Sequence, residues 1–431
     1  MLSDTTRVSD AIASTESRYF HHRSSCRLCH SRDVEIVVPL APIPIATPNV
    51  DLEAAKTKYA EVGGVAVPLD LYLCRACGHL QLLDVVDPEV QYRNFLYTTS
   101  ISLGLPEHFQ QLARDVLARI GTEGLVLEIG SNDGTLLRAF KEQGCRVLGI
   151  DPAQKIAERA TAAGLPTLPL FFNAATAADI RGTHGTARAV ICNNTFANLD
   201  DLDDVIAGIR AILAEDGIFV FETSYGADVV TNTLIDTVYH EHLSYFMVRP
   251  LERFFTAHGL DLFDVQRMWT KGGSLRGFVQ HRGGARPCSA AVAAMIAEEQ
   301  ALGLDGDAPF RRFRDKLSNI RQTLAGYGEA ARKSGRPFVG YGASVGSVTL
   351  IQQFGLAASM SFLVDDKPLG PELHLPGCAL RIELPTALYE HKPEHVVILA
   401  WRYAGPIIAK HQKFLESGGK FVIPLPEIVL R

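Results

Sequence analysis

Two pairs of cysteines stand near the start of the sequence, and each pair encloses two residues. The pairs are Cys26 with Cys29 and Cys74 with Cys77. Two such turns supply four thiolates, which is the ligand set that holds a Zn²⁺ ion in tetrahedral coordination. Because four protein ligands leave no position for an activated water, we expect a structural zinc that takes no part in catalysis. His30 or His79 in place of one cysteine is the alternative ligand set.

A second group of polar residues begins at residue 128, where an apolar strand reads directly into a predicted helix through Glu-Ile-Gly-Ser-Asn-Asp-Gly. Backbone amides in such a turn can approach a bound cofactor closely. A dinucleotide fingerprint requires glycine where this chain has Asn132, which argues against NAD. The loop instead fits the amino-acid end of S-adenosylmethionine; an NAD site and a structural turn are the alternatives. The loop residues expected at the cofactor are Glu128, Gly130, Ser131, Asn132, Asp133 and Gly134.

Three more polar residues follow predicted strands further along the chain. Asp151 ends the strand VLGID, where a carboxylate can accept hydrogen bonds from both hydroxyls of a ribose. This feature is common to NAD enzymes and methyltransferases, so it does not choose between them. Asn173 and Asn194 are further candidates for cofactor contacts, and each is equally well explained as a turn residue.

A cluster of ionisable side chains lies at residues 239–246, which read Tyr-His-Glu-His-Leu-Ser-Tyr-Phe. An imidazole titrates near pH 6.5, so either histidine of the cluster is suited to removing a proton at working pH. Taken by itself, the cluster is also typical of a surface helix or of a satisfied hydrogen-bond network.

The elements that must position these groups alternate between strands and helices, which predicts an α/β fold with a parallel sheet covered on both faces. A chain of 431 residues is long enough for two or three domains. We expect a flexible tail over 1–23, a zinc-binding β-rich module over 24–85, a Rossmann-like domain that binds S-adenosylmethionine over 86–285, a helical linker over 286–333, and a C-terminal Rossmann-like substrate domain over 334–431.

Composition and charge limit the partners. The net charge is −6 and no run of lysine and arginine is present, so nucleic acid is not an expected partner. No stretch reaches the roughly 20 apolar residues that span a bilayer, and the first 22 residues lack the apolar centre of a signal peptide. We expect a cytoplasmic protein, monomeric or homodimeric, that acts on a small molecule.

Taken together, the paired cysteines, EIGSNDGTL, the Tyr239–Phe246 cluster and the Gly-Gly-Ser-Leu-Arg-Gly sequence at 272–277 resemble the deoxysugar C-methyltransferases. These zinc-containing enzymes use S-adenosylmethionine to methylate C3 of nucleotide-linked 4-keto sugars in antibiotic or surface-glycan assembly. The resemblance extends from about residue 24 to the C-terminus and includes YGAS at 341–344, Pro376-Gly377 and GGKFVIPLP.

The resemblance implies a role for individual residues. His242 would be the base that removes the C3 proton, Glu241 would orient or tune it, and Tyr239 and Tyr97 would contact the substrate near the reacting carbon. The choice of His242 over His240 rests on the motif match. The residues implied for substrate binding are Arg276, Tyr341 and Ser344. For Arg276, a phosphate of the substrate and an internal carboxylate are both open as partners.

Two other functions compete with this one. The first is transfer of a methyl group to carbon, oxygen or nitrogen of another small molecule. The second is a non-catalytic protein that binds zinc and S-adenosylmethionine and serves in interaction with a partner.

Overall fold

The computed structural model describes residues 18–45, 65–93, 95, 97–102, 104–366 and 380–431. Its elements alternate along most of the chain, which confirms the predicted α/β fold with Rossmann-like parallel sheets behind an N-terminal β module. The Pro376-Gly377 element and residues 1–17 of the expected tail lie outside the described residues. No helix of the described part is long and apolar enough to cross a membrane.

The N-terminal module is built from short antiparallel strands. They are β1 (Phe20–His22), β2 (Val34–Val38), β3 (Ile43–Pro44), β4 (Ala66–Val67), β5 (Leu71–Cys74), β6 (Leu80–Gln81) and β7 (Asp84–Val86). A four-stranded sheet has the order β13-β6-β5-β2, and its edge strand β13 (Ser244–Tyr245) comes from the histidine-rich cluster far along the chain. The module therefore completes its sheet with residues that directly follow His242.

The tail that we predicted over 1–23 includes residues that belong to the folded module. Residues Phe20–His22 form β1, which pairs with β7, and His22 Nδ1 lies 3.0 Å from the carboxylate of Asp84. The ring of Phe20 packs against a small apolar cluster that contains Val86. A polar segment with two adjacent aromatic residues, Tyr19 and Phe20, gave no periodicity from which this pairing could be predicted.

A seven-stranded sheet forms the centre of the chain, with the order β10-β9-β8-β11-β12-β15-β14. The strands are β8 (Leu125–Ile129), β9 (Arg146–Ile150), β10 (Thr167–Leu168), β11 (Ala187–Asn193), β12 (Leu213–Ser224), β14 (Leu260–Met268) and β15 (Ser274–His281). Strands β8 to β12 run parallel, β15 is antiparallel to β12, and the edge strand β14 is antiparallel to β15, so β14 again runs in the direction of β12. Alternate residues such as Val126 and Leu127 enter different apolar clusters, because successive side chains of a strand point to opposite faces.

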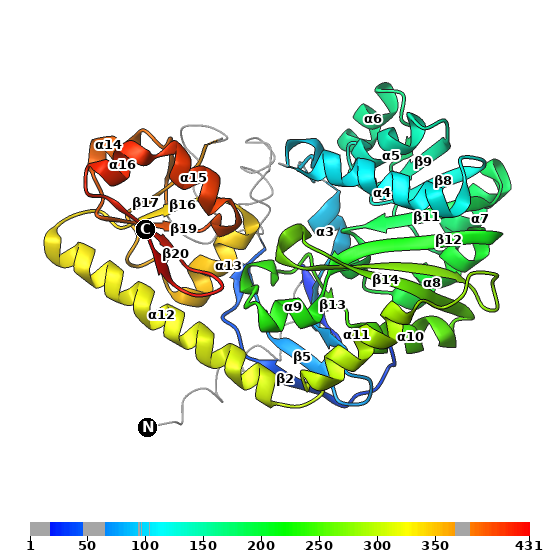
Figure 1. Cartoon of the computed structure of the whole chain (residues 1–431), viewed down its shortest axis with the longest axis horizontal. Coiled ribbons are helices and arrows are strands. Elements are labelled where there is room, and N and C mark those ends of the chain that lie inside the picture. Colours follow the sequence, from blue (N-terminus) through cyan, green and yellow to red (C-terminus); the bar gives the residue numbers. More distant parts are fainter. Residues whose placement is uncertain (1–17, 46–64, 94, 96, 103, 367–379) are drawn as a thin grey trace.

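Helices cover both faces of this sheet (Figure 1). The elements around it are α3 (Pro88–Tyr92), η1 (Thr99–Ile101), α4 (Leu105–Ile120), α5 (Thr135–Lys141), α6 (Gln154–Ala162), α7 (Ala174–His184), η2 (Phe196–Asn198), α8 (Leu202–Ile212), α9 (Gly226–Thr231), η3 (Ile235–Thr237), α10 (Val248–Ala257) and η4 (Thr270–Gly272). In Figure 1, α4 and α5 lie above the sheet and α8, α10 and α11 (Ala290–Ala301) lie below it.

The C-terminal part is a second, six-stranded sheet of order β18-β17-β16-β19-β20-β21, parallel except for β21. Its strands are β16 (Val339–Tyr341), β17 (Phe362–Val364), β18 (Ile382–Glu383), β19 (His395–Ile398), β20 (Lys420–Ile423) and β21 (Val429–Leu430). The helices are α13 (Val345–Phe354), α14 (Ala387–His391), η5 (Trp401–Tyr403), α15 (Ala404–Lys410) and α16 (Gln412–Glu416).

The long helix α12 (Ala308–Ser334) connects the two halves and runs along one side of the molecule (Figure 1). It packs against β2 of the N-terminal module, α9 of the central part and α13 of the C-terminal part. Direct bonds add to this contact: Thr349 Oγ1 donates to the carbonyl of Val238 at 3.0 Å, and Trp401 Nε1 donates to the Asp236 carboxylate at 3.0 Å. The three parts are therefore fixed around the segment that carries the histidine cluster.

Candidate active site

The four paired cysteines come together in one cluster. Sγ of Cys26 lies 3.7 Å from that of Cys77, Sγ of Cys29 lies 3.5 Å from that of Cys74, and all four sulfurs lie within 4.8 Å of one another. A tetrahedral zinc ion with bonds of about 2.3 Å separates its sulfurs by about 3.8 Å, so the cluster fits zinc.

The two histidines considered as alternative ligands have other partners. His79 Nε2 lies 3.2 Å from the hydroxyl of Ser244, and His30 Nε2 lies 3.1 Å from the carboxylate of Asp203. None of the four cysteines lines the pocket described next, which agrees with a structural metal.

A cavity of about 460 Å³ lies where the carboxyl ends of β8, β9 and β11 meet η3, η4, η5 and the start of α13. Gly130, Asn132 and Asp151 form part of its wall. In parallel α/β sheets, ligands bind at this edge. The cavity therefore joins the expected cofactor site to the histidine cluster and to the C-terminal part.

The loop after β8 is held against β9 by backbone contacts. Asn132 N donates to Asp151 Oδ2 at 2.8 Å, and Gly130 N donates to the carbonyl of Ile150 at 2.7 Å. Gly130 has φ of 73°, and a Cβ added there would lie 2.1 Å from Thr195 Oγ1, so no larger residue fits. This tight turn brings the backbone of the loop to the pocket.

Polar atoms without partners line the same part of the pocket. Neither Oδ1 nor Nδ2 of the buried Asn193 has a hydrogen-bond partner among the described residues. Asn194, a predicted cofactor residue with φ of 55°, follows it on the pocket wall. Buried polar groups are almost always paired, so Asn193 indicates that a polar ligand belongs here, and S-adenosylmethionine supplies such groups.

Other predicted cofactor residues lie behind the pocket wall. Glu128, Ser131, Asp133 and Gly134 support the loop without lining the cavity. Burial raises the pKa of Glu128 well above its ordinary value, and Asp133 accepts hydrogen bonds from Ser100 N and from Thr135.

Asn173 has a different role from the predicted cofactor contact. Its side chain accepts from Thr176 N at 2.8 Å and caps the N-terminus of α7 in a reciprocal capping box. An Asn that precedes a helix has the same sequence appearance whether it caps the helix or contacts a ligand, and here capping occupies the amide oxygen.

His242 lies on the pocket wall with Tyr239 and Glu241. His242 Nδ1 lies 2.8 Å from the carbonyl oxygen of Thr237, which can only accept, so Nδ1 carries the proton. Nε2 is then the unprotonated nitrogen, and the hydroxyl of Tyr239 donates to it at 3.2 Å. The Tyr239 hydroxyl occupies the lone pair of Nε2 in this structure, so the imidazole is a proton acceptor for a ligand that displaces this hydroxyl.

His240 does not line the pocket. Its Nε2 lies 3.0 Å from the carbonyl of Pro68 in the N-terminal module. Of the two histidines in the cluster, only His242 is placed to meet a ligand in the cavity.

Glu241 does not orient His242, since the carbonyl of Thr237 does so. Glu241 Oε1 accepts from Gln91 Nε2 at 3.3 Å, and burial raises the pKa of its carboxyl to about 7. Burial also raises the pKa of the phenols of Tyr239 and Tyr97, so both remain hydrogen-bond donors at neutral pH. Tyr97 lines the pocket and bonds to the hydroxyl of Ser102.

The three residues implied for substrate binding are placed differently from one another. Ser344 lines the pocket and caps α13. Tyr341 lies off the pocket, where its hydroxyl contacts Asp366 at 3.0 Å and His411 at 3.1 Å. The predicted contact of Tyr341 with substrate is therefore not seen.

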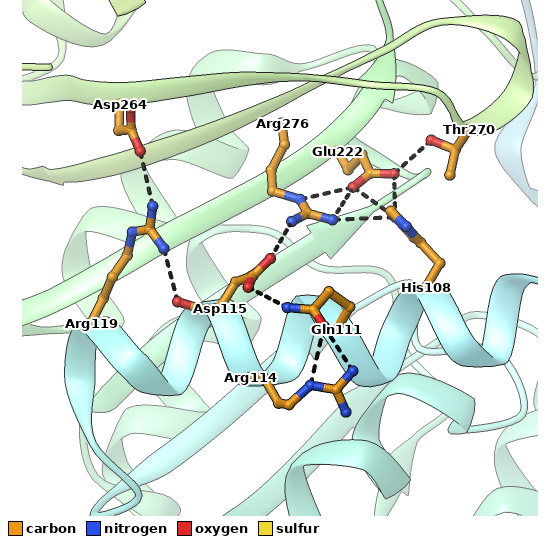
Figure 2. A network of polar contacts seen from close by, with 9 residues as sticks. All are labelled: His108, Gln111, Arg114, Asp115, Arg119, Glu222, Asp264, Thr270 and Arg276. Atoms are coloured by element: carbon orange, nitrogen blue, oxygen red, sulfur yellow. Dashed lines mark hydrogen bonds and ion pairs between the residues drawn. The ribbon is translucent and has the colours of Figure 1, made fainter. Parts of the chain in front are cut away.

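Arg276 is fully buried and binds internal carboxylates, so its predicted role in substrate binding is wrong. Its Nη2 lies 2.8 Å from Glu222 and its Nη1 lies 3.1 Å from Asp115, as Figure 2 shows. These contacts join β15 to β12 and α4. The sequence left this choice open, and the antiparallel register that opposes Arg276 to Glu222 decides it.

Three family models match consecutive parts of the chain. A zinc binding domain matches residues 26–92, a methyltransferase domain matches 105–265, and a C-methyltransferase C-terminal domain matches 269–426. The C-methyltransferase NovU of Streptomyces niveus is 34% identical over 406 residues, which cover 93% of this chain and 95% of NovU. The chain belongs to the C-methyltransferase family.

This assignment confirms the predicted enzyme class. The C-methyltransferase has a place for each predicted cofactor, S-adenosylmethionine at the carboxyl edge of the central sheet and zinc on the four cysteines. Both cofactor predictions are confirmed.

Similarity to solved structures is much weaker. Magnesium protoporphyrin IX methyltransferase of Synechocystis PCC 6803 with bound SAH is 15% identical, covers 42% of this chain and 84% of its own, and gives a TM-score of 0.33. The PH0226 protein of Pyrococcus horikoshii OT3 is 12% identical, covers 46% and 96%, and gives a TM-score of 0.35. Similarity at this level adds nothing to the family assignment.

The C-methyltransferase pocket is also lined by charged residues that sequence reasoning missed, namely Asp200, Asp236, Lys271 and Arg402. Arg402 Nη2 donates to Asp236 Oδ1 at 3.0 Å, which joins the central and C-terminal parts at the cavity. Lys271 directly precedes the Gly-Gly-Ser motif. Its place before this motif was the only sequence signal for Lys271, because the neighbouring residues do not show that the turn faces the pocket.

Proposed function

We propose that this C-methyltransferase removes the C3 proton of a nucleotide-activated 4-keto-deoxysugar with His242 and methylates the resulting enolate carbon. The observation that carries the proposal is the fixed tautomer of His242, which has an unprotonated Nε2 and lines the same cavity as Asn193 and Asp151. Base and cofactor site thus share one pocket, as methylation of an enolate requires.

The cofactor supplies an electrophilic methyl group on a sulfonium sulfur. Gly130, Asn132, Asp151, Asn193 and Asn194 are the residues proposed to hold it, since each lines the carboxyl edge of the central sheet. Within the described part of the chain, the carboxylate of Asp151 accepts only two backbone amides, of Asn132 and Ala153, and its remaining lone pairs are suited to ribose hydroxyls.

The substrate needs a base on one side and donors on the other. His242 accepts the proton from carbon at Nε2, while Thr237 keeps Nδ1 protonated and the ring in place. Burial, with the nearby charges of Lys271 and Arg402, lowers the pKa of His242 to about 3. The imidazole is therefore neutral at working pH, and proton transfer to it requires strong stabilisation of the enolate.

The nucleotide portion would extend toward the C-terminal part. The cavity continues to Ser344, Val345 and Gly346 at the start of α13 and to Arg402 in η5. This wall supports a substrate larger than the reacting sugar and agrees with the substrate-domain role expected for the C-terminal Rossmann-like region.

The decisive experiment follows hydrogen exchange and methylation together. The protein is incubated in D₂O with S-adenosylmethionine and a panel of dTDP-4-keto-deoxysugars, and C3 is observed by proton NMR and mass spectrometry. We expect deuterium at C3 and a methyl group on carbon, both reduced at least about 100-fold in His242→Gln. His240→Gln changes the same residue type away from the pocket and is the matched control.

Methylation on oxygen or nitrogen without C3 exchange would instead favour another small-molecule substrate. Binding of S-adenosylmethionine with neither exchange nor product across the panel would reject the nucleotide-sugar assignment.

A further inference from the structure

The turn that leads into the Gly-Gly-Ser motif holds a lysine in an unusual backbone conformation. Lys271 has φ of 53° and ψ of 21°, in the left-handed region that residues with a side chain seldom adopt. Such a conformation persists only where the surrounding structure enforces it, and it is concentrated at functional sites.

Contacts on both sides of Lys271 enforce the turn. Thr270 Oγ1 donates to Glu222 Oε1 at 2.8 Å, and the hydroxyl of Ser274 donates to the carbonyl of Thr270 at 2.9 Å. Gly273 has φ of 149°, and a Cβ added there would lie 2.5 Å from Cβ of Asp228. The small residues of the motif therefore allow the chain to close tightly behind Lys271.

Glu222 is itself fixed by a buried network, shown in Figure 2. Its carboxylate lies 2.8 Å from His108 Nε2 and 2.8 Å from Arg276 Nη2. Although burial opposes ionisation, the hydrogen bond from His108 and the charge of Arg276 hold the pKa of Glu222 below its ordinary value. The arginine of the motif thus acts through Glu222 and Thr270 on the position of Lys271.

Lys271 lines the pocket together with His242 and Glu241. Its ammonium forms no hydrogen bond or ion pair with any residue in the described part of the chain, whereas the other pocket cation, Arg402, is paired with Asp236. Lys271 is only partly buried and lines the open pocket, so its ammonium is available to an acceptor on a ligand.

We propose that Lys271 is a catalytic residue that donates a hydrogen bond to the carbonyl oxygen of the substrate and stabilises the enolate. The inference rests on the proposed function. When His242 takes the proton from C3, the electron pair of the C–H bond forms a carbon–carbon double bond, and the electrons of the C=O π bond move to oxygen. Lys271 holds that oxyanion, as hydrogen-bond donors do in other enolate-forming sites.

The charges around Lys271 give the step a defined pH dependence. Burial lowers the pKa of Lys271 to about 8, while Glu241 and Glu222 oppose this shift and Arg402 adds to it. His242, which is neutral above a pKa of about 3, and the paired Asp236 line the same pocket. So do the phenols of Tyr239 and Tyr97, whose pKa values are raised by burial. Lys271 is positively charged below about pH 8 and neutral above it. Because the charge stabilises the enolate oxygen, C3 exchange should fall as pH rises through about 8.

The test compares the parent protein with Lys271→Gln and Lys271→Arg. C3 exchange in D₂O is measured from pH 6 to pH 10 on the dTDP-4-keto-deoxysugar that the parent exchanges fastest, and S-adenosylmethionine affinity and thermal denaturation are measured alongside. We expect Lys271→Gln to slow exchange at least about 100-fold with unchanged cofactor affinity and melting. We expect Lys271→Arg to restore part of the rate and to remove the fall above pH 8, because guanidinium stays charged.

The exposed Lys333 on α12 provides the matched control, and Lys333→Gln should exchange like the parent. Equal rates in the parent and Lys271→Gln, or an unchanged alkaline fall in Lys271→Arg, would overturn the catalytic role of Lys271 alone. No exchange in the parent with any sugar of the panel would overturn the proposed function, and this inference with it.

Discussion

At the scale of single residues, the pocket places one carboxyl group beside one ammonium group. Glu241 raises the pKa of Lys271 by attraction, and Lys271 lowers that of Glu241 in return. Glu241 is charged above its pKa of about 7, and Lys271 is charged below its pKa of about 8. Both groups are therefore charged together only in a narrow range of pH. The activity of the enzyme should therefore depend on their coupling.

Replacing Glu241 by Gln should move the alkaline fall in activity to lower pH. The neutral amide no longer stabilises the ammonium, so the pKa of Lys271 drops and its charge is lost earlier as pH rises. The kcat/KM of the variant against pH measures the shift. Glu142→Gln, at the exposed residue that directly follows α5, makes the same charge change away from the pocket. If kcat/KM of Glu241→Gln falls at the same alkaline pH as in the parent protein, Glu241 does not act on Lys271.

At the scale of elements, the network around Arg276 joins α4, β12 and β15 and supports the turn η4 (Figure 2). Arg276 has no contact with the pocket, so its loss should act through stability and through the position of Lys271.

We expect Arg276→Ala to lower the free energy of unfolding by about 3–5 kcal/mol, because Glu222 would keep a buried charge without its main counterion. Chemical denaturation followed by circular dichroism measures this, and Arg332→Ala on the exposed face of α12 should cost less than about 1 kcal/mol. A raised KM with unchanged stability would instead return Arg276 to the substrate-binding role.

Local patterns in the sequence were sufficient for the cysteine cluster, the loop after β8 and the strand–helix alternation, because each depends on neighbouring residues. The positions of Arg276, Asn173 and Lys271 were not predictable in this way. Arg276 depends on a cross-strand register, Asn173 on where a helix begins, and Lys271 on which side of a turn faces a cavity between distant segments. Such contacts are set by tertiary packing.

At the scale of the whole molecule, the zinc module and the histidine cluster share a sheet. Strand β13 pairs with β6, and Leu82 N donates to the carbonyl of Leu243 at 2.9 Å, directly after His242. The metal therefore supports the base from a distance, although it does not line the pocket.

We expect Cys74→Ser to lose most of its zinc and most of its C3 exchange activity, because the module that carries β6 is held together by the metal. Zinc content by mass spectrometry and amide hydrogen exchange at Ser244 and Tyr245 report the two effects. Cys145→Ser changes a buried cysteine outside the cluster and should keep both zinc and activity. Full activity in a zinc-free Cys74→Ser protein would separate the module from catalysis.

The pairing of β13 with β6 also sets an order of events during synthesis. The N-terminal module emerges from the ribosome first, yet the edge strand of its sheet arrives only after most of the central sheet has been made. Until then the edge of β6 has no partner, and an open edge invites pairing with another chain. A fragment that ends before residue 244 should therefore be prone to aggregation even with zinc bound, and the module is better regarded as the first half of a joint folding unit than as a detachable domain.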